Sequence, residues 1–373
     1  MSEAAAGPGS GAGWARRRVA VTGLGVLSAF GRGPEALSAA ICAGKPAFGP
    51  VGRFGTAGRA VHDAALLPGA PDLAEEVLTA IDTARRQAGL AAESGEDRTA
   101  VLLALHADAR TSGIAWQVGR IHNLEDVYTS ACVAASTAVA DAAARISLGL
   151  RDRMVVVAGY LVEPDTFAMF DAGRALARDG QARPFSAGRG GLLLGDAVTA
   201  VVLEAESSVL ERGAAVLAWI AGWGRTGDAY HVCRPVPDGS GLARAIELAL
   251  GRADLRPQDV GYVNANATGA ALADSAEVSA LRTAFGTRLE RLPVSSTKSV
   301  HGHALEGSAL LELIATILTL STGALPVNAG YLGPDEPPLD LVLTPGRPTD
   351  ARYALSLNSA FGGANTALVV QAA

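Results

Sequence analysis

Strand-like runs of β-branched residues alternate with longer Ala/Leu-rich stretches along this 373-residue chain, and the whole alternation occurs twice. Such alternation is typical of α/β proteins, in which helices cover the faces of a sheet. The predicted strands are 18–25, 99–105, 154–159, 198–204, 216–223, 260–264, 293–296, 353–358 and 366–371. The predicted helices are 33–44, 134–148, 241–250, 271–285 and 303–320. The sequence therefore predicts two similar α/β halves that join near 206–213, with irregular segments at 48–71 and 330–349.

Composition narrows the class of protein. Hydrophobic residues make up 49% of the chain and charged residues 18%, so a large core can form. The net charge of −6 argues against a nucleic-acid or polybasic membrane partner. No window supplies the roughly 18 uncharged apolar residues of a membrane span, because the best candidate, 310–320, contains Glu312. We expect a cytoplasmic protein whose residues 1–15 form a flexible tail.

The three cysteines are odd in number and widely spaced, which argues against a disulfide framework or a zinc ribbon. Cys132 lies in TSACVAAS, after a predicted strand and at the start of a helix. A helix N-terminus stabilises a thiolate, so we expect a lowered thiol pKa and a nucleophile at this position. The alternative is a small buried hydrophobic side chain, which is the interpretation we keep for Cys42 and Cys233.

A cysteine nucleophile needs a partner that handles protons and donors for an oxyanion. His303 lies at another predicted strand-to-helix junction, between Lys298 and Glu312. Lys298 and Glu312 form either a structural ion pair or a pair that tunes the proton balance of the site. A metal clamp at His301 and His303 would have only Glu306 as a further ligand nearby, so we predict no metal.

Three other segments carry polar groups or glycines. Asn266 and Thr268 follow a predicted strand, and their side chains either contact a ligand or satisfy the turn. Phe361 precedes two glycines in a predicted hairpin turn, where backbone N–H groups are free to hold an oxyanion. The glycine turn expected at 22–25 lacks the G-x-G-x-x-G spacing and an acidic partner, so a dinucleotide site is disfavoured.

Taken in order, these segments resemble the β-ketoacyl synthase family of the thiolase superfamily. The resemblance runs from Arg17 to near the C-terminus and is closer to the type II polyketide ketosynthases at the last glycine-rich loop. The segments that carry it are RRVAVTGLGVLS, SACVAAS, RPFSAGRGGLLLGD, DAYH, KSVHGH with Glu312, and NSAFGGAN.

The resemblance implies a thiolase-like fold of two stacked βαβαβ halves, 16–208 and 209–373, in a layered α-β-α-β-α sandwich. It implies that Cys132 accepts an acyl group from the phosphopantetheine of an acyl carrier protein, with no bound cofactor. The N–H groups of Cys132 and Phe361 would form the oxyanion hole, and Phe361 would gate the pocket. His303 would support decarboxylation of a malonyl-type extender and stabilise the enolate, while Lys298 and Glu312 orient the site.

Three departures from the family pattern leave the reaction open. Asn266 stands where the family has its other catalytic histidine; an amide donates a hydrogen bond but does not carry a proton as imidazole does. Thr268 keeps the pantetheine contact that the resemblance implies, but Ala270 replaces its partner threonine. The stretch from Leu105 to Cys132 is shorter than in the family, where it contributes to the dimer interface and acyl pocket.

Three functions remain from the sequence. The first is an acyl-transferring ketosynthase that either condenses or only transfers acyl groups, working as a homodimer or as a heterodimer with a ketosynthase paralogue. The second is a non-catalytic partner similar to a chain-length factor, which Asn266 favours. The retained site residues oppose it, namely Cys132, Lys298, His303 and Glu312. The third, which the motifs favour less, is a thiolase that works without a carrier protein.

Overall fold

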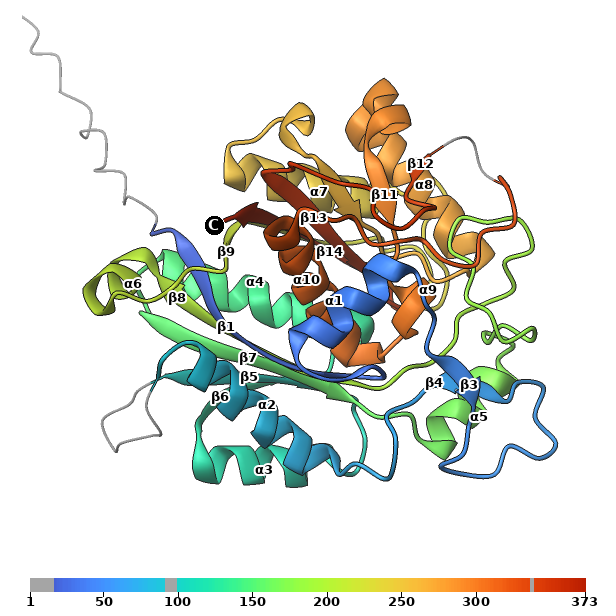
Figure 1. The fold of residues 1–373 in the computed structure, drawn as a ribbon, viewed down its shortest axis with the longest axis horizontal. Helices are drawn as coiled ribbons and strands as arrows, with labels where there is room; N and C mark the ends of the chain where they lie inside the picture. Colours follow the sequence, from blue (N-terminus) through green and yellow to red (C-terminus); the bar gives the residue numbers. More distant parts are fainter. Residues whose placement is uncertain (1–16, 91–98, 336–338) are drawn as a thin grey trace, which may run out of the picture.

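The computed structural model describes residues 17–90, 99–335 and 339–373, and the tail expected at 1–15 lies outside them. The described chain folds into five layers, helices alternating with two halves of a sheet (Figure 1). This architecture confirms the α-β-α-β-α sandwich that the resemblance implies.

The two halves of the sheet repeat one topology. The first half runs in the order β6, β5, β7, β8, β1, and the second runs in the order β11, β10, β13, β14, β9. The strands of the first half are β1 (Val19–Ser28), β5 (Ala100–Leu105), β6 (Asn123–Tyr128), β7 (Arg153–Tyr160) and β8 (Ala197–Ala205). Those of the second are β9 (Ala218–Gly227), β10 (Tyr262–Asn264), β11 (Pro293–Ser295), β13 (Tyr353–Ser359) and β14 (Ala364–Ala372).

The halves are hydrogen-bonded to each other at one corner. The start of β1 pairs antiparallel with β9, Val19 opposite Ile220 and Val21 opposite Ala218. On its other side β1 pairs antiparallel with β8 from Val19 to Ser28. The helix α6 (Glu206–Arg212) connects β8 to β9 along the chain. The two halves expected from the double alternation are therefore present, and they share a continuous strand order.

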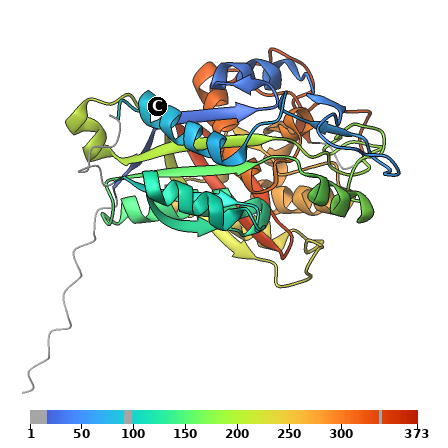
Figure 2. The same ribbon diagram turned by 90° about the horizontal axis from the view of Figure 1, so that it is seen from below.

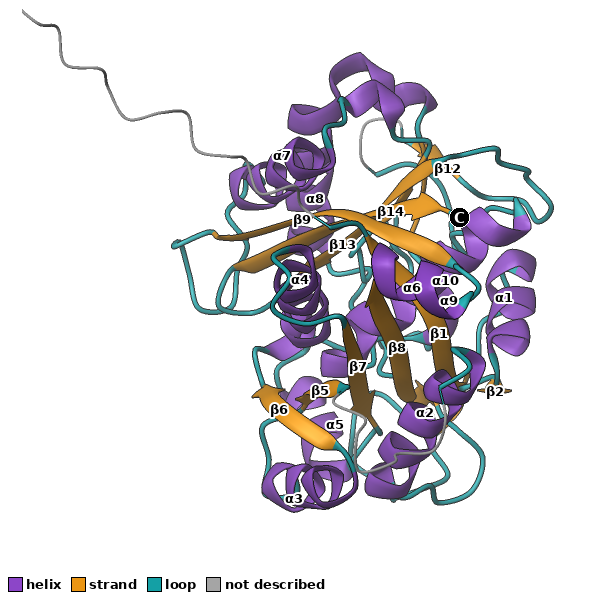
Figure 3. Cartoon of the chain, turned by 90° about the vertical axis from the view of Figure 1, so that its left-hand side faces the viewer, coloured by secondary structure: helices purple, strands orange, loops and turns teal. Residues whose placement is uncertain are grey.

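Two helices fill the space between the halves. They are α4 (Ala134–Ser147) and α10 (Leu305–Thr322), and Figure 3 shows both between the strands. α4 is rich in Ala and α10 in Leu and Ile, and both contribute to one apolar cluster with residues of β1, β7 and β8. α10 is the one helix among the described residues that is long and apolar enough to cross a membrane, but most of it is buried here.

The outer helices cover the two exposed faces. α2 (Leu73–Gln87) and α3 (Thr111–Ile121) cover the first half and face the viewer in Figure 2. α7 (Ser240–Ala253) and α8 (Ala271–Phe285) cover the second half, on the opposite side of the molecule (Figure 3). Neither α2 nor α3 was among the predicted helices.

The glycine turn expected at 22–25 is wrong, because β1 continues to Ser28. A Cβ at Gly23 or Gly25 would overlap a carbonyl oxygen of α2, so these glycines let the helix lie close on the strand. Gly224 on β9 has the same relation to the carbonyl oxygen of Ala245 on α7. The glycines of β1 thus serve helix packing, and a phosphate-binding turn is excluded there.

The remaining elements are short. They are α1 (Pro34–Ala43), α5 (Pro164–Ala172), α9 (Lys298–His301), η1 (Ala131–Val133), η2 (Pro257–Asp259), η3 (Gly286–Arg291), β2 (Gly31–Arg32), β3 (Phe48–Pro50), β4 (Asp63–Ala65) and β12 (Asp340–Leu341). The segments predicted to be irregular contain only β3, β4 and β12 among their described residues. The proline-rich segment at 330–349 contributes only the edge strand β12, as the missing N–H groups of proline require.

Candidate active site

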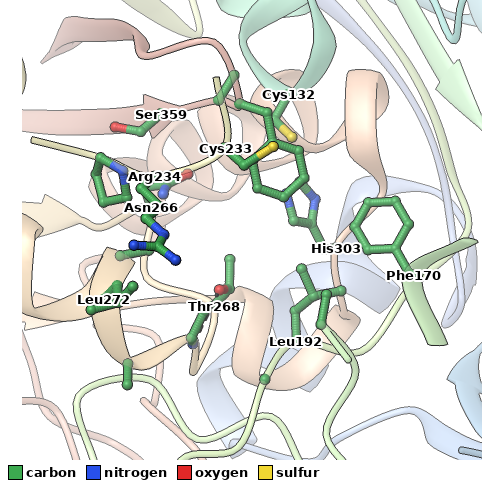
Figure 4. A pocket seen from close by; sticks show the side chains of 18 of the residues that line it. Cys132, Phe170, Leu192, Cys233, Arg234, Asn266, Thr268, Leu272, His303 and Ser359 are labelled. Atoms are coloured by element: carbon green, nitrogen blue, oxygen red, sulfur yellow. Dashed lines mark hydrogen bonds between the residues drawn. The ribbon is translucent and has the colours of Figure 1, made fainter. Parts of the chain in front are cut away.

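Strand-to-helix junctions from both halves open on one cavity of about 430 Å³ (Figure 4). Cys132, Asn266, Thr268, His303 and Phe361 all line it, so the structure brings the sequence-predicted residues together. The strand-to-helix junctions lie after β6, β10 and β11, and Phe361 comes from the loop between β13 and β14. These loops gather because strand ends on the same side of a sheet lie close together. Residues also lining this cavity are Phe170, Arg174, Arg189, Leu192, Cys233, Arg234, Leu272 and Ser359.

Cys132 is presented by a tight turn between β6 and α4. It lies in η1, directly before α4, and the preceding Ala131 has a φ of +52°. A non-glycine residue in this left-handed region is strained, and the surrounding packing has to hold it there. The turn leaves the side chain of Cys132 facing the cavity, as Figure 4 shows.

The expected lowering of the Cys132 pKa is contradicted. Burial, and next the charge of Glu306, raise the pKa of the Cys132 thiol to about 12, while Lys298 opposes the shift. The position of Cys132 at a helix start could not reveal the raised pKa, because the Glu306 carboxylate comes from the first turn of α10, far along the chain. Cys132 is therefore a neutral thiol at neutral pH.

Lys298 and Glu312 form a buried ion pair behind the cavity. The Lys298 Nζ lies 2.7 Å from Glu312 Oε2, and Asn358 Nδ2 donates to the same oxygen at 2.7 Å. The Lys298 ammonium also donates to Asn266 Oδ1 at 3.4 Å. Because an ammonium only donates, this contact turns the amide oxygen of Asn266 toward Lys298 and leaves Nδ2 for another acceptor.

His303 is fixed as a hydrogen-bond donor. Its backbone bonds to residues of the GLLLGD motif: its N–H donates to the carbonyl of Leu193 at 2.7 Å, and its carbonyl accepts from Gly195. Its Nδ1 accepts the N–H of Leu305 at 3.1 Å, so in the neutral ring the proton lies on Nε2. Burial and the nearby Lys298 charge hold the pKa of His303 well below its usual range, which keeps the ring neutral.

His301 takes no part in the cavity lining. Its Nδ1 bonds to the carbonyl of Gly302 at 2.7 Å and its Nε2 to Thr297 Oγ1 at 3.0 Å. Burial lowers the pKa of His301 to about 3. The two ring nitrogens thus hold the turn that leads to His303, and within the described residues no cluster of metal-ligating side chains is found.

The turn that carries Asn266 and Thr268 is held by two carboxyl groups of α8. Glu277 Oε1 accepts the N–H of Asn266 at 2.7 Å, and Asp274 Oδ1 accepts the N–H of Thr268 at 3.1 Å. Asp274 also accepts from Phe185 N, 2.9 Å away, in the RPFS motif. Burial raises the pKa of Asp274 to about 6 and that of Glu277 to about 8.

Phe361 lines the cavity from the loop between β13 and β14. It is 53% exposed and its ring stacks on Phe170, with 6.3 Å between ring centroids. The loop is tied to the DAYH motif, because Asp228 N donates to the carbonyl of Gly363 at 2.8 Å and Asp228 Oδ1 accepts from Asn365 at 2.6 Å. The expected oxyanion hole at the N–H groups of Cys132 and Phe361 stays a prediction.

The sequence reasoning missed several groups at this site. Glu306 is buried and bonds to His106 Nδ1 at 3.1 Å, although 200 positions separate them, and His106 packs edge-on against Tyr160. Asp274 and Glu277 could have been found from their i, i+3 spacing after the Asn266 junction. Cys233, for which we expected no chemistry, lines the same cavity as Cys132.

Comparisons with known proteins agree with this geometry. Residues 125–208 match the family described as "Beta-ketoacyl synthase, N-terminal domain", and residues 217–331 match "Beta-ketoacyl synthase, C-terminal domain". Nodulation protein E of Rhizobium leguminosarum bv. trifolii is 40% identical over 244 residues, which cover 64% of this chain and 59% of that protein. The 3-oxoacyl-[acyl-carrier-protein] synthase 2 of Staphylococcus aureus is 36% identical over 248 residues, covering 64% and 61%. The chain thus spans about 60% of the length of these curated relatives.

A solved structure covers more of the chain. The ishigamide ketosynthase/chain length factor superposes with a TM-score of 0.88 at 28% identity, covering 96% of this chain and 100% of that one. Since the two family descriptions begin at residue 125, this similarity includes most of the chain before that point.

Proposed function

Because the chain belongs to the β-ketoacyl synthase family of the thiolase superfamily, we propose that it accepts an acyl group from an acyl carrier protein on Cys132. The observation that carries the proposal is the single cavity lined by Cys132, Asn266 and His303. A thioester arm that enters this cavity meets a nucleophile and two hydrogen-bond donors. In the proposed role the substrate is bound to phosphopantetheine, and the chain needs no cofactor of its own.

The first step is a thioester exchange. The Cys132 sulfur forms a bond to the acyl carbon, the bond from that carbon to the pantetheine sulfur breaks, and the thiol proton ends on the released pantetheine. The N–H groups of Cys132 and Phe361 are the proposed donors to the oxyanion. Since the Cys132 thiol is neutral at neutral pH, its proton has to leave during the step, which makes acylation faster at higher pH.

The second step takes place at the two donors across the cavity. Asn266 Oδ1 and His303 Nδ1 each accept a hydrogen bond from the protein. The other side-chain nitrogens, Asn266 Nδ2 and His303 Nε2, are therefore available to donate to a thioester oxygen. Two donors stabilise an enolate without moving a proton, so decarboxylation of a malonyl thioester followed by condensation fits this geometry. Transfer of the acyl group without extension fits as well, because it needs only the first step.

A dimer is part of the proposal. The strand β6 ends the sheet, and its outer edge pairs with no other strand of the described residues. Val127 on β6 is exposed, and so is Trp116 on α3, a helix that packs against β6. An open edge strand with exposed apolar side chains favours association with another chain, either a second copy or a ketosynthase paralogue.

The test is the intact mass of the protein after incubation with an acyl carrier protein thioester. We expect an acyl adduct on the wild type and on Cys233→Ala, and no adduct on Cys132→Ala. Addition of malonyl-carrier protein then separates the reactions, because condensation releases carbon dioxide and simple transfer does not. Absence of an adduct with short and long acyl chains would overturn the enzyme proposal.

The raised thiol pKa favours a second candidate function, a partner subunit similar to a chain-length factor. In that role the chain shapes the cavity of an active ketosynthase and keeps Cys132 unacylated. The same experiment decides between the two functions: no adduct, together with a stable complex with a ketosynthase paralogue, supports the partner role. We expect the chain to act in the cytoplasm, where its free cysteines stay reduced.

A further inference from the structure

Glu277 is a buried ionisable group that has no role in the proposed reaction steps. Glu277, on α8, is only 3% exposed, and its Oε1 accepts the N–H of Asn266 at 2.7 Å. Its second oxygen, Oε2, is buried and has no hydrogen-bond partner among the described residues. A buried polar atom without a partner costs about 1–3 kcal/mol, so such an atom usually faces a bound water, ion or ligand.

A second, smaller cavity adjoins Glu277. Its volume is about 30 Å³, which is room for one water molecule. Its polar lining comes from Glu277, Asn266, Ser359, Asp228 and Asn365. Pro235, Asn266, Ala273 and Ser359 also line the large cavity, so the two spaces are neighbours across Asn266.

The polar groups around this space can hold a water molecule. Asp228 is already an acceptor for Asn365 Nδ2 at 2.6 Å and for Val236 N at 3.0 Å. Ser359 Oγ donates to Asn365 Oδ1 at 2.7 Å and keeps its lone pairs for a further donor. Both Glu277, whose Oε2 has no partner among the described residues, and Ser359 line this space. A water bonded to these two groups would meet the usual need for two to four polar partners.

We propose that a water molecule binds in the small cavity and that Glu277, in its neutral form, acts through this water as a positioning residue for the thioester beside Asn266. The proposal rests on the proposed function. The Glu277 carboxylic acid donates its hydrogen to the water, and the water then directs a hydrogen toward the large cavity. Together with Asn266 Nδ2 and His303 Nε2, it stabilises the oxygen that gains charge when a malonyl thioester loses carbon dioxide. No covalent bond to Glu277 forms, and its proton stays on the acid.

The charges around Glu277 support the neutral form. Burial raises its pKa to about 8, and the neighbouring Asp274 carboxyl on α8 adds to the shift. Lys298 on α9 and the N–H groups of Asn266 and Ala267 oppose it. From the other side the small cavity is lined by Asp228 after β9, by Asn365 on β14 and, from α7, by the uncharged Leu242. Above pH 8 the ionised carboxylate would accept from the water and reverse its orientation.

The experiment measures single-turnover release of carbon dioxide from malonyl-carrier protein, by enzyme already acylated at Cys132, between pH 6 and 9. The variant is Glu277→Gln, which keeps the shape and a donor group but does not titrate. The matched control is Glu247→Gln, which removes the same chemical group from an exposed position on α7. From pH 7 to 9 the neutral fraction of a group with a pKa near 8 falls about tenfold. We expect a tenfold loss of rate in the wild type and in the control, and a flat profile in Glu277→Gln.

A second measurement needs no substrate. Infrared difference spectra of the wild type minus Glu277→Gln should contain a carboxylic-acid carbonyl band at pH 6 that disappears by pH 9. Absence of this band means that Glu277 is ionised and overturns the proposal, as does an equal alkaline loss in Glu277→Gln. Acylation without release of carbon dioxide at any pH also overturns it, because no charged oxygen then forms for the water to face. A failure of Cys132 to become acylated would instead overturn the proposed function, while the infrared band still reports the charge of Glu277.

Discussion

Alkylation of Cys132 by iodoacetamide tests the charge environment of the nucleophile most directly. The structure raises the thiol pKa to about 12, through burial first and the Glu306 charge second. At pH 8, which is about four units lower, roughly one molecule in 10⁴ then carries the thiolate. An exposed cysteine with a pKa near 8.5 is about one quarter thiolate at the same pH.

The rate ratio follows from two opposing effects. The thiolate fraction of Cys132 is about 2,500 times smaller than that of the exposed cysteine, but a more basic thiolate is more nucleophilic, with a Brønsted coefficient of about 0.4–0.5. Over about 3.5 pKa units this coefficient returns a factor of roughly 25 to 60. We expect Cys132 to react about 40 to 100 times more slowly than free cysteine at pH 8, with a logarithmic rate that rises by about one per pH unit up to pH 10.

Glu306→Gln isolates the contribution of the carboxylate. Removing one nearby like charge lowers a pKa by about one unit, so the thiolate fraction rises about tenfold. The loss of nucleophilicity reduces the net gain in alkylation rate to about threefold. Glu247→Gln is the matched control, and it should leave the rate unchanged because its carboxylate lies on an exposed helix face.

Peptide-level mass spectrometry reads Cys132 separately from Cys42 and Cys233, so no cysteine has to be removed. A plateau of the alkylation rate below pH 9 would refute the reasoning. It would mean that the start of α4 outweighs burial and Glu306, and that the sequence-based expectation of a lowered thiol pKa was right after all.

Three further predictions concern stability, each measured as the urea-induced free energy of unfolding. Glu312→Gln should lower the free energy of unfolding by about 3–5 kcal/mol, because it leaves the Lys298 ammonium buried without its counter-ion. Lys298→Met should lower it less, since a lone buried Glu312 can take up a proton. Equal losses in the two variants would contradict this asymmetry. Gly224→Ala should destabilise the protein by more than about 1 kcal/mol, because a Cβ there overlaps the carbonyl oxygen of Ala245; a neutral effect would mean that α7 shifts freely on the sheet. Glu277→Gln should become more stable relative to wild type as the pH rises from 5 to 8. The reason is that a carboxyl group whose pKa is raised on folding loses its contribution to stability as the pH rises through the folded-state pKa. A stability difference that does not change with pH would argue against the raised pKa of Glu277.

The periodic parts of the fold could be predicted from the sequence because each is encoded locally. Strands such as β7 and β8 are continuous apolar runs, and α10 is a long Leu-rich segment that ends at a glycine. The position of reactive residues at strand-to-helix junctions was also predictable, since loops at strand ends gather in α/β proteins. For this reason Cys132 and His303, 171 positions apart, could be placed in one site before their contacts were known.

Other features could not be predicted because they depend on partners distant in the chain. The role of Gly23 in β1 requires the position of α2, about 60 residues later. The thiol pKa of Cys132 depends on Glu306, which lies on a helix of the other half. The direction of the Asn266 amide depends on Lys298, and neither side chain alone indicates it.

The energetics of the buried Lys298 help to decide between an acyl-transferring enzyme and a partner subunit that only retains the shape of the site. Lys298 is 1% exposed and is paired with the buried Glu312 carboxylate. Burying these two charges costs several kcal/mol, which their attraction offsets only in part. A subunit that merely supported a partner would be more stable with apolar side chains of similar size at these two positions. The pair does achieve one thing that apolar residues could not: it turns the oxygen of Asn266 away from the cavity and leaves the amide donor available. Because a polar arrangement of this cost is useful only where a ligand oxygen meets that donor, the Lys298–Glu312 pair favours the acyl-transferring enzyme over the partner subunit.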